Sequence, residues 1–189
     1  ELARLVNRTG NYEESKGFAI EAERIMNAGP DAHAQSLEYQ YSAAHTLNVL
    51  SSTVAESVDD VEEAIRLRTR SDKFFGELLR KAPHVQKYRK SAIQNRFALA
   101  DAHAHGGNAE EGLRVALEGV EWTQELVELS TGDLDSTMTL GQNYAWSGDI
   151  ARQGGQTTQS LELLDTGINI MKECIAAQPR WASTTRSCW

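Results

Sequence analysis

The residues most suited to metal chemistry lie in the segment 101–105, because carboxylates and imidazoles are common metal ligands. On an α-helix, His103 and His105 are two residues apart and point about 200° away from each other, so they cannot share one ion. Asp101 and His105 are four residues apart and lie on the same helix face. Two ligands do not complete a site, and no other histidine has useful spacing. The sequence therefore predicts neither a metal nor another cofactor, and favours a polar surface here.

The other reactive residue types also have structural explanations. Gly106-Gly107 and Gly154-Gly155 do not follow a strand pattern and lack the spacing of phosphate-binding loops, so we interpret them as turn glycines. Pairs of acidic residues such as Glu110-Glu111 fall in the first turns of predicted helices, where they complement the positive helix end. No Ser-His-Asp or Cys-His arrangement has supporting context. The sequence therefore does not predict an enzyme.

The chain has 189 residues and a formal net charge of −8. Affinity for a phosphate backbone comes mainly from lysine and arginine, so we predict no nucleic-acid partner. Basic residues do cluster within 80–96, but at helical spacing they fall on several faces, which favours a solvated surface. No apolar run reaches about 18 residues, so we predict no membrane insertion.

The first residues already have the pattern of a helix, with Leu2, Leu5 and Val6 at helical spacing. The chain begins with neither Met nor a signal-peptide pattern. We therefore expect one domain, residues 1–189, excised from a larger protein. Two cysteines are too few for a disulfide framework, so the compartment stays open, with the cytoplasm favoured.

Turn residues recur along the chain at a nearly fixed period. The turns begin near positions 10, 59, 107 and 155, and each precedes a new amphipathic stretch. A second mark lies halfway through three of these units, at Pro83, Thr131 and Pro179. The period is about 48 residues, within the range typical of a solenoid of helix pairs.

Small and apolar positions recur in register with the turns. Small residues stand five and twelve positions after the turns: Ser15, Ala64, Gly112 and Ser160, then Ser71, Gly119 and Gly167. Apolar residues dominate six, fifteen and nineteen positions after them: Ile65, Leu113 and Leu161, then Phe74, Trp122 and Ile170, then Leu78, Leu126 and Cys174. This spacing is what the buried stripe of a helix requires.

The pattern predicts an all-α fold of antiparallel helix pairs. Glycine at a turn suits a left-handed cap, Asp or Asn beside it caps the next helix, and the proline precedes the following pair. The predicted helices are 1–8, 11–28, 32–57, 60–82, 84–106, 108–130, 133–154 and 156–178, followed by a final segment 180–189.

This arrangement resembles the tetratricopeptide (TPR) repeat. The best local match is Leu140-Gly141 followed by Tyr144 and Gly148-Asp149, whereas the period places the turn at Gly155 instead. In that register Gly148 is a small helix residue equivalent to Ala100 and Ser52. The units exceed the usual length of about 34 residues, so the chain is similar to the long-helix TPR-like variant of bacterial signalling proteins. The resemblance implies a right-handed α-α superhelix with a period of about 48 residues.

The resemblance also implies that the first helix of each pair lines a concave face that binds protein or peptide. Carried onto this chain, the partner-binding residues are Gln94, Phe97, Asp101, His105, Gln142, Trp146, Asp149 and Arg152. The helix 32–57 contributes Thr46, Val49, Leu50, Thr53 and Glu56. Trp146 is interpreted either as a peptide anchor or as packing against the next repeat.

The leading functional hypothesis is a non-enzymatic scaffold that binds a protein or peptide on this face. One alternative is a regulatory or sensor segment of a multidomain bacterial signalling protein, such as a kinase or a transcriptional regulator. Another is a homodimer formed through the end helices, because an uncapped solenoid end exposes apolar surface, here including Trp181 and Trp189.

Overall fold

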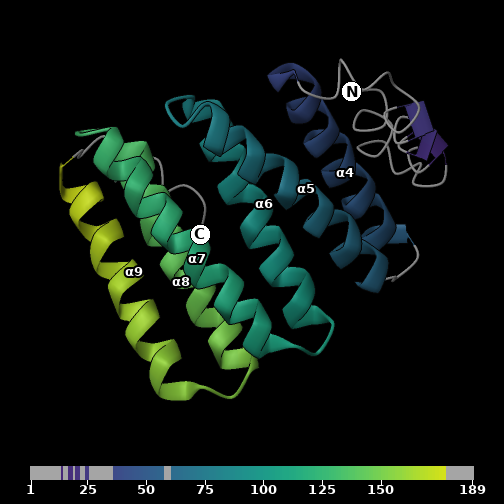
Figure 1. The fold of residues 1–189 in the computed structure, drawn as a ribbon. Helices are drawn as coiled ribbons and strands as arrows, with labels where there is room; N and C mark the ends of the chain where they lie inside the picture. Colours follow the sequence, from purple (N-terminus) through teal and green to yellow (C-terminus); the bar gives the residue numbers. More distant parts are fainter. Residues whose placement is uncertain are drawn as a thin grey trace.

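The computed structural model describes residues 36–57 and 61–177, together with the isolated helical positions 14, 17, 18, 20, 21, 24 and 25. Within 36–57 and 61–177, six long helices follow one another: α4 (Leu37–Ser57), α5 (Val61–Lys81), α6 (Gln86–His105), α7 (Ala109–Leu129), α8 (Leu134–Gln153) and α9 (Thr157–Ala177). Each packs antiparallel against the next in chain order (Figure 1). These described residues form an all-α helical repeat of three helix pairs.

The predicted boundaries of the last five of these helices agree with the structure to within two residues. The first, α4, begins after Ser36, whose hydroxyl oxygen accepts the backbone N–H of Tyr39 at 3.1 Å and so caps the helix. Its predicted start at residue 32 lies outside the described residues. The turns at Gly10 and Asp59, Pro179, the predicted helix 1–8 and the segment 180–189 also lie outside them, as does most of 11–28.

The turns inside the second and third helix pairs are built as predicted. Gly107 and Gly155 have φ angles of 82° and 74°, the left-handed region that glycine adopts without strain. Asn108 follows and caps α7, because its side-chain oxygen accepts the Glu111 N–H at 3.2 Å. Gly148 lies inside α8, so the turn is at Gly155, as the period predicts.

Glycines bring the two helices of a pair into close contact. A Cβ atom on Gly167 of α9 would lie 2.5 Å from the carbonyl oxygen of Gly141 in α8. A Cβ atom on Gly112 of α7 would lie 2.7 Å from the carbonyl oxygen of Ala100 in α6. The small positions five and twelve residues after the turns are therefore where the backbones approach each other.

In the first described pair, serine hydroxyls occupy these crossing points. Ser71 of α5 donates to the carbonyl oxygen of Ala44 at 3.0 Å, and Ser51 of α4 donates to that of Ala64 at 3.0 Å. Ser51, and not Ser52 as predicted, is therefore equivalent to Ala100. Equivalent positions of α4 and α6 are therefore one residue farther apart in the sequence than the turns that follow these helices.

Buried asparagines join successive pairs. Asn95 of α6 donates to the carbonyl oxygen of Arg68 and to Oδ1 of Asp72 in α5, both at 3.3 Å. Asn143 stands one period later, in α8, and donates to Oγ1 of Thr123 in α7 at 2.9 Å. These bonds fix how each pair sits on the previous one, because a buried amide without a partner is costly.

The apolar core runs along the array, and its position nineteen residues after each turn is buried as predicted at Leu78, Leu126 and Cys174. Leu161 differs from its equivalent Leu113, because 59% of it is exposed. It lies on α9, the last described helix, and no later described helix packs on that side. No described helix combines the length and the apolarity that crossing a bilayer requires.

Candidate binding face on the first helices of the pairs

The first helices of the pairs, α4, α6 and α8, each keep one side that their neighbours do not cover. On α6 this side carries Gln94, Asp101 and His105, which are seven and four residues apart and so share one face. Gln142 and Asp149 hold the equivalent positions in α8. With Trp146 and Arg152 these residues form what we call the A face: Gln94, Asp101, His105, Gln142, Trp146, Asp149 and Arg152. All are exposed or half-buried.

Trp146 is the largest exposed apolar group of the A face, with 43% of the residue exposed. Its ring centroid lies 5.7 Å from that of Phe97 in α6, with 33° between the ring planes. Trp146 therefore packs against the neighbouring pair and still presents much of its surface to solvent.

Phe97 was predicted to contact a partner, and the structure corrects this, because only 2% of it is exposed. Its ring points into the array and fills the space above Gly119 of α7, where a Cβ atom would lie 2.7 Å from the ring. Phe97 is therefore the support on which Trp146 rests.

Beside Trp146, a carboxylate is held in a fixed orientation. Oδ1 of Asp149 accepts hydrogen bonds from Nε and Nη2 of Arg152 at 2.9 and 2.7 Å. Its Oδ2 accepts a hydrogen bond from Nε2 of Gln153 at 3.0 Å. The Arg152 bonds and then the Gln153 bond hold the pKa of Asp149 below its ordinary value, so the carboxylate is ionised at neutral pH.

Asp101 and His105 lie on the same helix face, as predicted, and contact each other. Nδ1 of His105 donates to the backbone carbonyl oxygen of Asp101 at 2.9 Å and lies 3.4 Å from its Oδ2. His103 lies elsewhere, near Glu111 and Arg114 of α7, and burial lowers the pKa of its imidazole while Glu111 opposes this. Among the described residues, no cluster of three or more His, Cys, Asp or Glu could hold a metal ion.

Sequence reasoning missed Arg68, which reaches from α5 to α4, the first helix of its pair. Its Nη2 donates to Oγ of Ser52 in α4 at 2.9 Å. Burial lowers the pKa of this guanidinium to about 10, while the charge of Asp101 on α6 opposes the shift. The equivalent residues one and two periods later, Ala116 and Leu164, are apolar. A charged residue at a position that is otherwise apolar was the feature of the sequence that could have identified Arg68.

Sequence reasoning also missed an aromatic cluster between α4 and α6. The hydroxyl of Tyr41 lies 3.1 Å from Nε2 of His45 and 3.3 Å from Oγ of Ser91. The ammonium of Lys87 lies 4.1 Å from the Tyr41 ring centroid, and the Tyr88 ring is 5.3 Å away. This cluster adds a cation and polar atoms beside the A face.

The predicted binding residues of α4 need a one-residue correction. Leu50 and Thr53 are buried, at 3% and 0% exposure, and the side chain of Glu56 lies outside what the structure describes. Because α4 and α6 are offset by one residue more than the period, the equivalents of Gln94 and Asp101 are His45 and Ser52.

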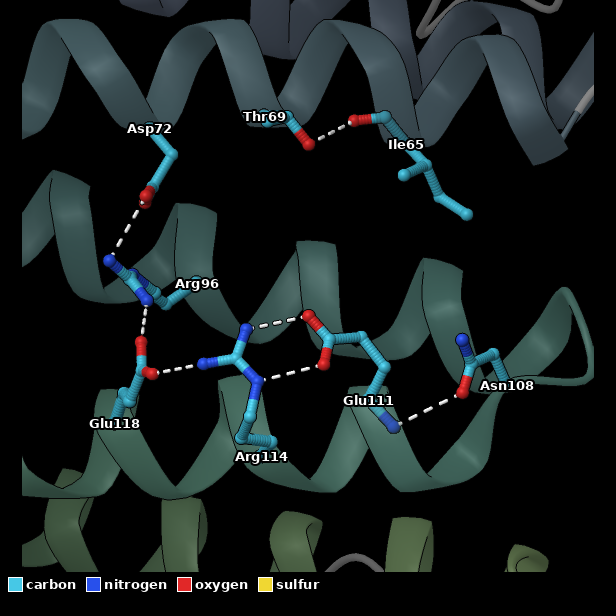
Figure 2. Close-up of polar contacts among 8 residues, drawn as sticks. All are labelled: Ile65, Thr69, Asp72, Arg96, Asn108, Glu111, Arg114 and Glu118. Atoms are coloured by element: carbon cyan, nitrogen blue, oxygen red, sulfur yellow. Dashed lines mark hydrogen bonds and ion pairs between the residues drawn. The ribbon is translucent and has the colours of Figure 1, made fainter.

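The opposite surface, formed by α5, α7 and α9, is different in character. Figure 2 shows Arg96 of α6 reaching between α5 and α7, where it pairs with Asp72 at 3.0 Å and with Glu118. Arg114 pairs with Glu118 as well and with Glu111 at 2.6 Å. These five charged residues of α5, α6 and α7 satisfy one another. The basic residues of 80–96 are spread over several faces, as their spacing predicts. Arg89 and Arg96 are not solvated as expected, because only 11% and 16% of their side chains are exposed and both form ion pairs.

Comparisons with known proteins bear on the fold. No protein-family model matches the chain, and no curated protein matches it by sequence. The structure is similar to one described as the DHF58 filament, with a TM-score of 0.56 and 15% identity over 95% of this chain and 92% of the other. It is also similar to the de novo designed helical repeat protein DHR64, with a TM-score of 0.51 and 17% identity over 97% and 91%.

TPR-like repeats from a putative kinesin light chain of Podosopora anserina align less well. Their TM-score is 0.38, with 15% identity over 94% of this chain and 93% of the other. At such identities a likeness concerns the fold alone. In its fold, the chain is similar to helical repeat proteins.

Proposed function

We propose that the chain is a non-enzymatic module that binds a peptide or protein segment across the A face, with Trp146 as the apolar anchor. One observation carries the proposal: Trp146 keeps 43% of its surface exposed while its ring rests on the buried ring of Phe97. Binding sites are typically centred on aromatic side chains that are already held in place.

The polar groups around Trp146 suit a peptide backbone. Gln94 and Gln142 each offer an amide donor and an acceptor, and Asp101 and Asp149 offer carboxylate oxygens. The glutamines recur after one period, as do the aspartates, so a segment lying across α6 and α8 meets the same groups twice. The helical repeat fold supports the proposal, because such arrays use extended surfaces for binding.

The experiment is a selection from a phage-displayed random peptide library, followed by binding measurements on three proteins. These are the wild type, Trp146→Ala, and Leu129→Ala as a matched control, since Leu129 is 58% exposed on α7. We expect Trp146→Ala to weaken selected peptides by roughly 2 kcal/mol, or about 30-fold. Leu129→Ala should leave the affinity unchanged.

Far-UV circular dichroism would confirm that both variants keep their helices. Equal binding by the wild type and Trp146→Ala would refute the assignment of the site to the A face. A library that yields no specific peptide would count against peptide binding itself.

A further inference from the structure

An apolar stripe runs along the outer side of α9. It consists of Leu161, Ile168 and Ile175, which are 59%, 40% and 36% exposed. The three residues are seven positions apart and therefore lie along one side of the helix, over a length of about 21 Å. Figure 1 shows α9 at one edge of the array, and the exposure of these three residues means that no other described helix covers this side.

The repeat identifies this stripe as a surface built for helix packing. The equivalent residues of α7, one period earlier, are Leu113, Val120 and Val127. The first two are buried, at 4% and 3% exposure, and the third is half-buried, in the core that α7 shares with α8. The same type of surface on α9 has no described helix over it.

The stripe is bordered by apolar side chains on one side and by charges on the other. Leu164 and Met171 lie against α8, because their Cγ atoms would be 2.8 and 2.7 Å from Cβ atoms placed on Gly148 and Gly141. The other border carries Asp165 and Lys172, both exposed. Neither has an ion-pair partner among the described residues.

This pattern is complementary to itself when the helix is reversed. With a two-fold axis at Ile168, Leu161 lies opposite Ile175 of a second copy. The same axis places Asp165 near Lys172 of the second copy, and Lys172 near Asp165 of the second copy. Charged residues that flank an apolar seam are what select partner and orientation between packed helices.

We propose that a second copy of this chain covers the stripe, with the two α9 helices packed antiparallel about Ile168. The contact uses one helix from each copy, which is less than a standard protein interface buries. The dimer therefore exchanges with the monomer as concentration changes. It leaves the A face open, so it does not depend on the proposed peptide binding.

The test is sedimentation velocity on the 189-residue chain across the micromolar range, with charge-exchange variants. Asp165→Lys and Lys172→Asp each place like charges opposite each other and should weaken the dimer by about tenfold or more. The double variant restores opposite charges and should restore the dimer. Glu162→Lys is the matched control, because it reverses a charge on α9 about 100° around the helix from Leu161.

Ile168→Lys, at the proposed axis, should abolish the dimer, and its exposed position means that the fold is retained, which circular dichroism would check. A monomer at every concentration would overturn the proposal, as would a dimer that survives Ile168→Lys. A mass that rises beyond the dimer would indicate an open head-to-tail contact and overturn the two-fold arrangement. Failure of the double variant to restore association would overturn the antiparallel register.

Discussion

Replacing Gly167 by alanine tests whether close backbone contact holds α8 and α9 together. The new Cβ atom would lie 2.5 Å from the carbonyl oxygen of Gly141 and 2.9 Å from the backbone nitrogen of Ala145. Both are backbone atoms, so no side-chain rotation relieves the overlap, and the two helices must separate. Gly76 of α5 is the matched control, because a Cβ atom there meets nothing within 4 Å.

The magnitudes follow from two opposing effects. Alanine in place of glycine inside a helix stabilises by about 0.5–1 kcal/mol, and this gain applies to both variants. Overpacking at Gly167 costs about 1–3 kcal/mol, at the upper end here because backbone must move. We therefore expect Gly167→Ala to lower the free energy of unfolding by about 1–2 kcal/mol, while Gly76→Ala raises it by about 0.5–1 kcal/mol.

Urea unfolding followed by far-UV circular dichroism would measure both changes, and hydrogen exchange would locate them. Because each pair of an array contacts only its neighbours, faster exchange after Gly167→Ala should concentrate in α8 and α9 and spare α4 and α5. If Gly167→Ala were as stable as Gly76→Ala, close backbone contact would not be the reason why small residues recur at the helix crossings.

Three further predictions concern single polar contacts. Asn143→Ala removes the buried donor to Thr123 and should lower the free energy of unfolding by about 1–3 kcal/mol in urea titrations, part of which Thr123→Val should recover. Asn108→Ala removes the cap of α7 and should cost about 1 kcal/mol in the same assay. Burial raises the pKa of Asp72 above its ordinary value of 3.8, although Arg96 opposes this. A raised folded-state pKa means that this group's contribution to stability is lost as pH rises from about 3.8 through that pKa, so Asp72→Asn should flatten this part of the stability–pH profile measured by thermal unfolding.

The sequence was sufficient to predict the helices, because their turns and crossing points need particular residues. Gly107 and Gly155 have positive φ angles, and Gly112 and Gly167 lie where no side chain fits, so these positions repeat visibly. Register in α4 was harder to predict. The contact of Ser51 with α5, and not the turn near residue 59, defines it, and that contact is not visible in the sequence.

The binding face was predictable only in part, because side-chain length and neighbouring volume decide exposure. Phe97 and Gln94 are both predicted to bind a partner, yet Phe97 points inward because Gly119 leaves room for its ring. Arg68 lies on α5, the second helix of its pair, where the repeat places no binding residue, but its long side chain reaches Ser52 on α4.

The difference between the two surfaces explains why binding is proposed on the A face. On the opposite surface, Arg96 and Arg114 are already paired with Asp72, Glu111 and Glu118, so a partner would desolvate charges that gain little from new contacts. On the A face, a partner covers the exposed part of a large aromatic ring that is already fixed in place. Burial of this surface is favourable, and little side-chain entropy remains to be lost. Charges are paired on the A face as well, at Asp149 and Arg152, so the exposed ring of Trp146, held in place by Phe97, is what favours this face for binding.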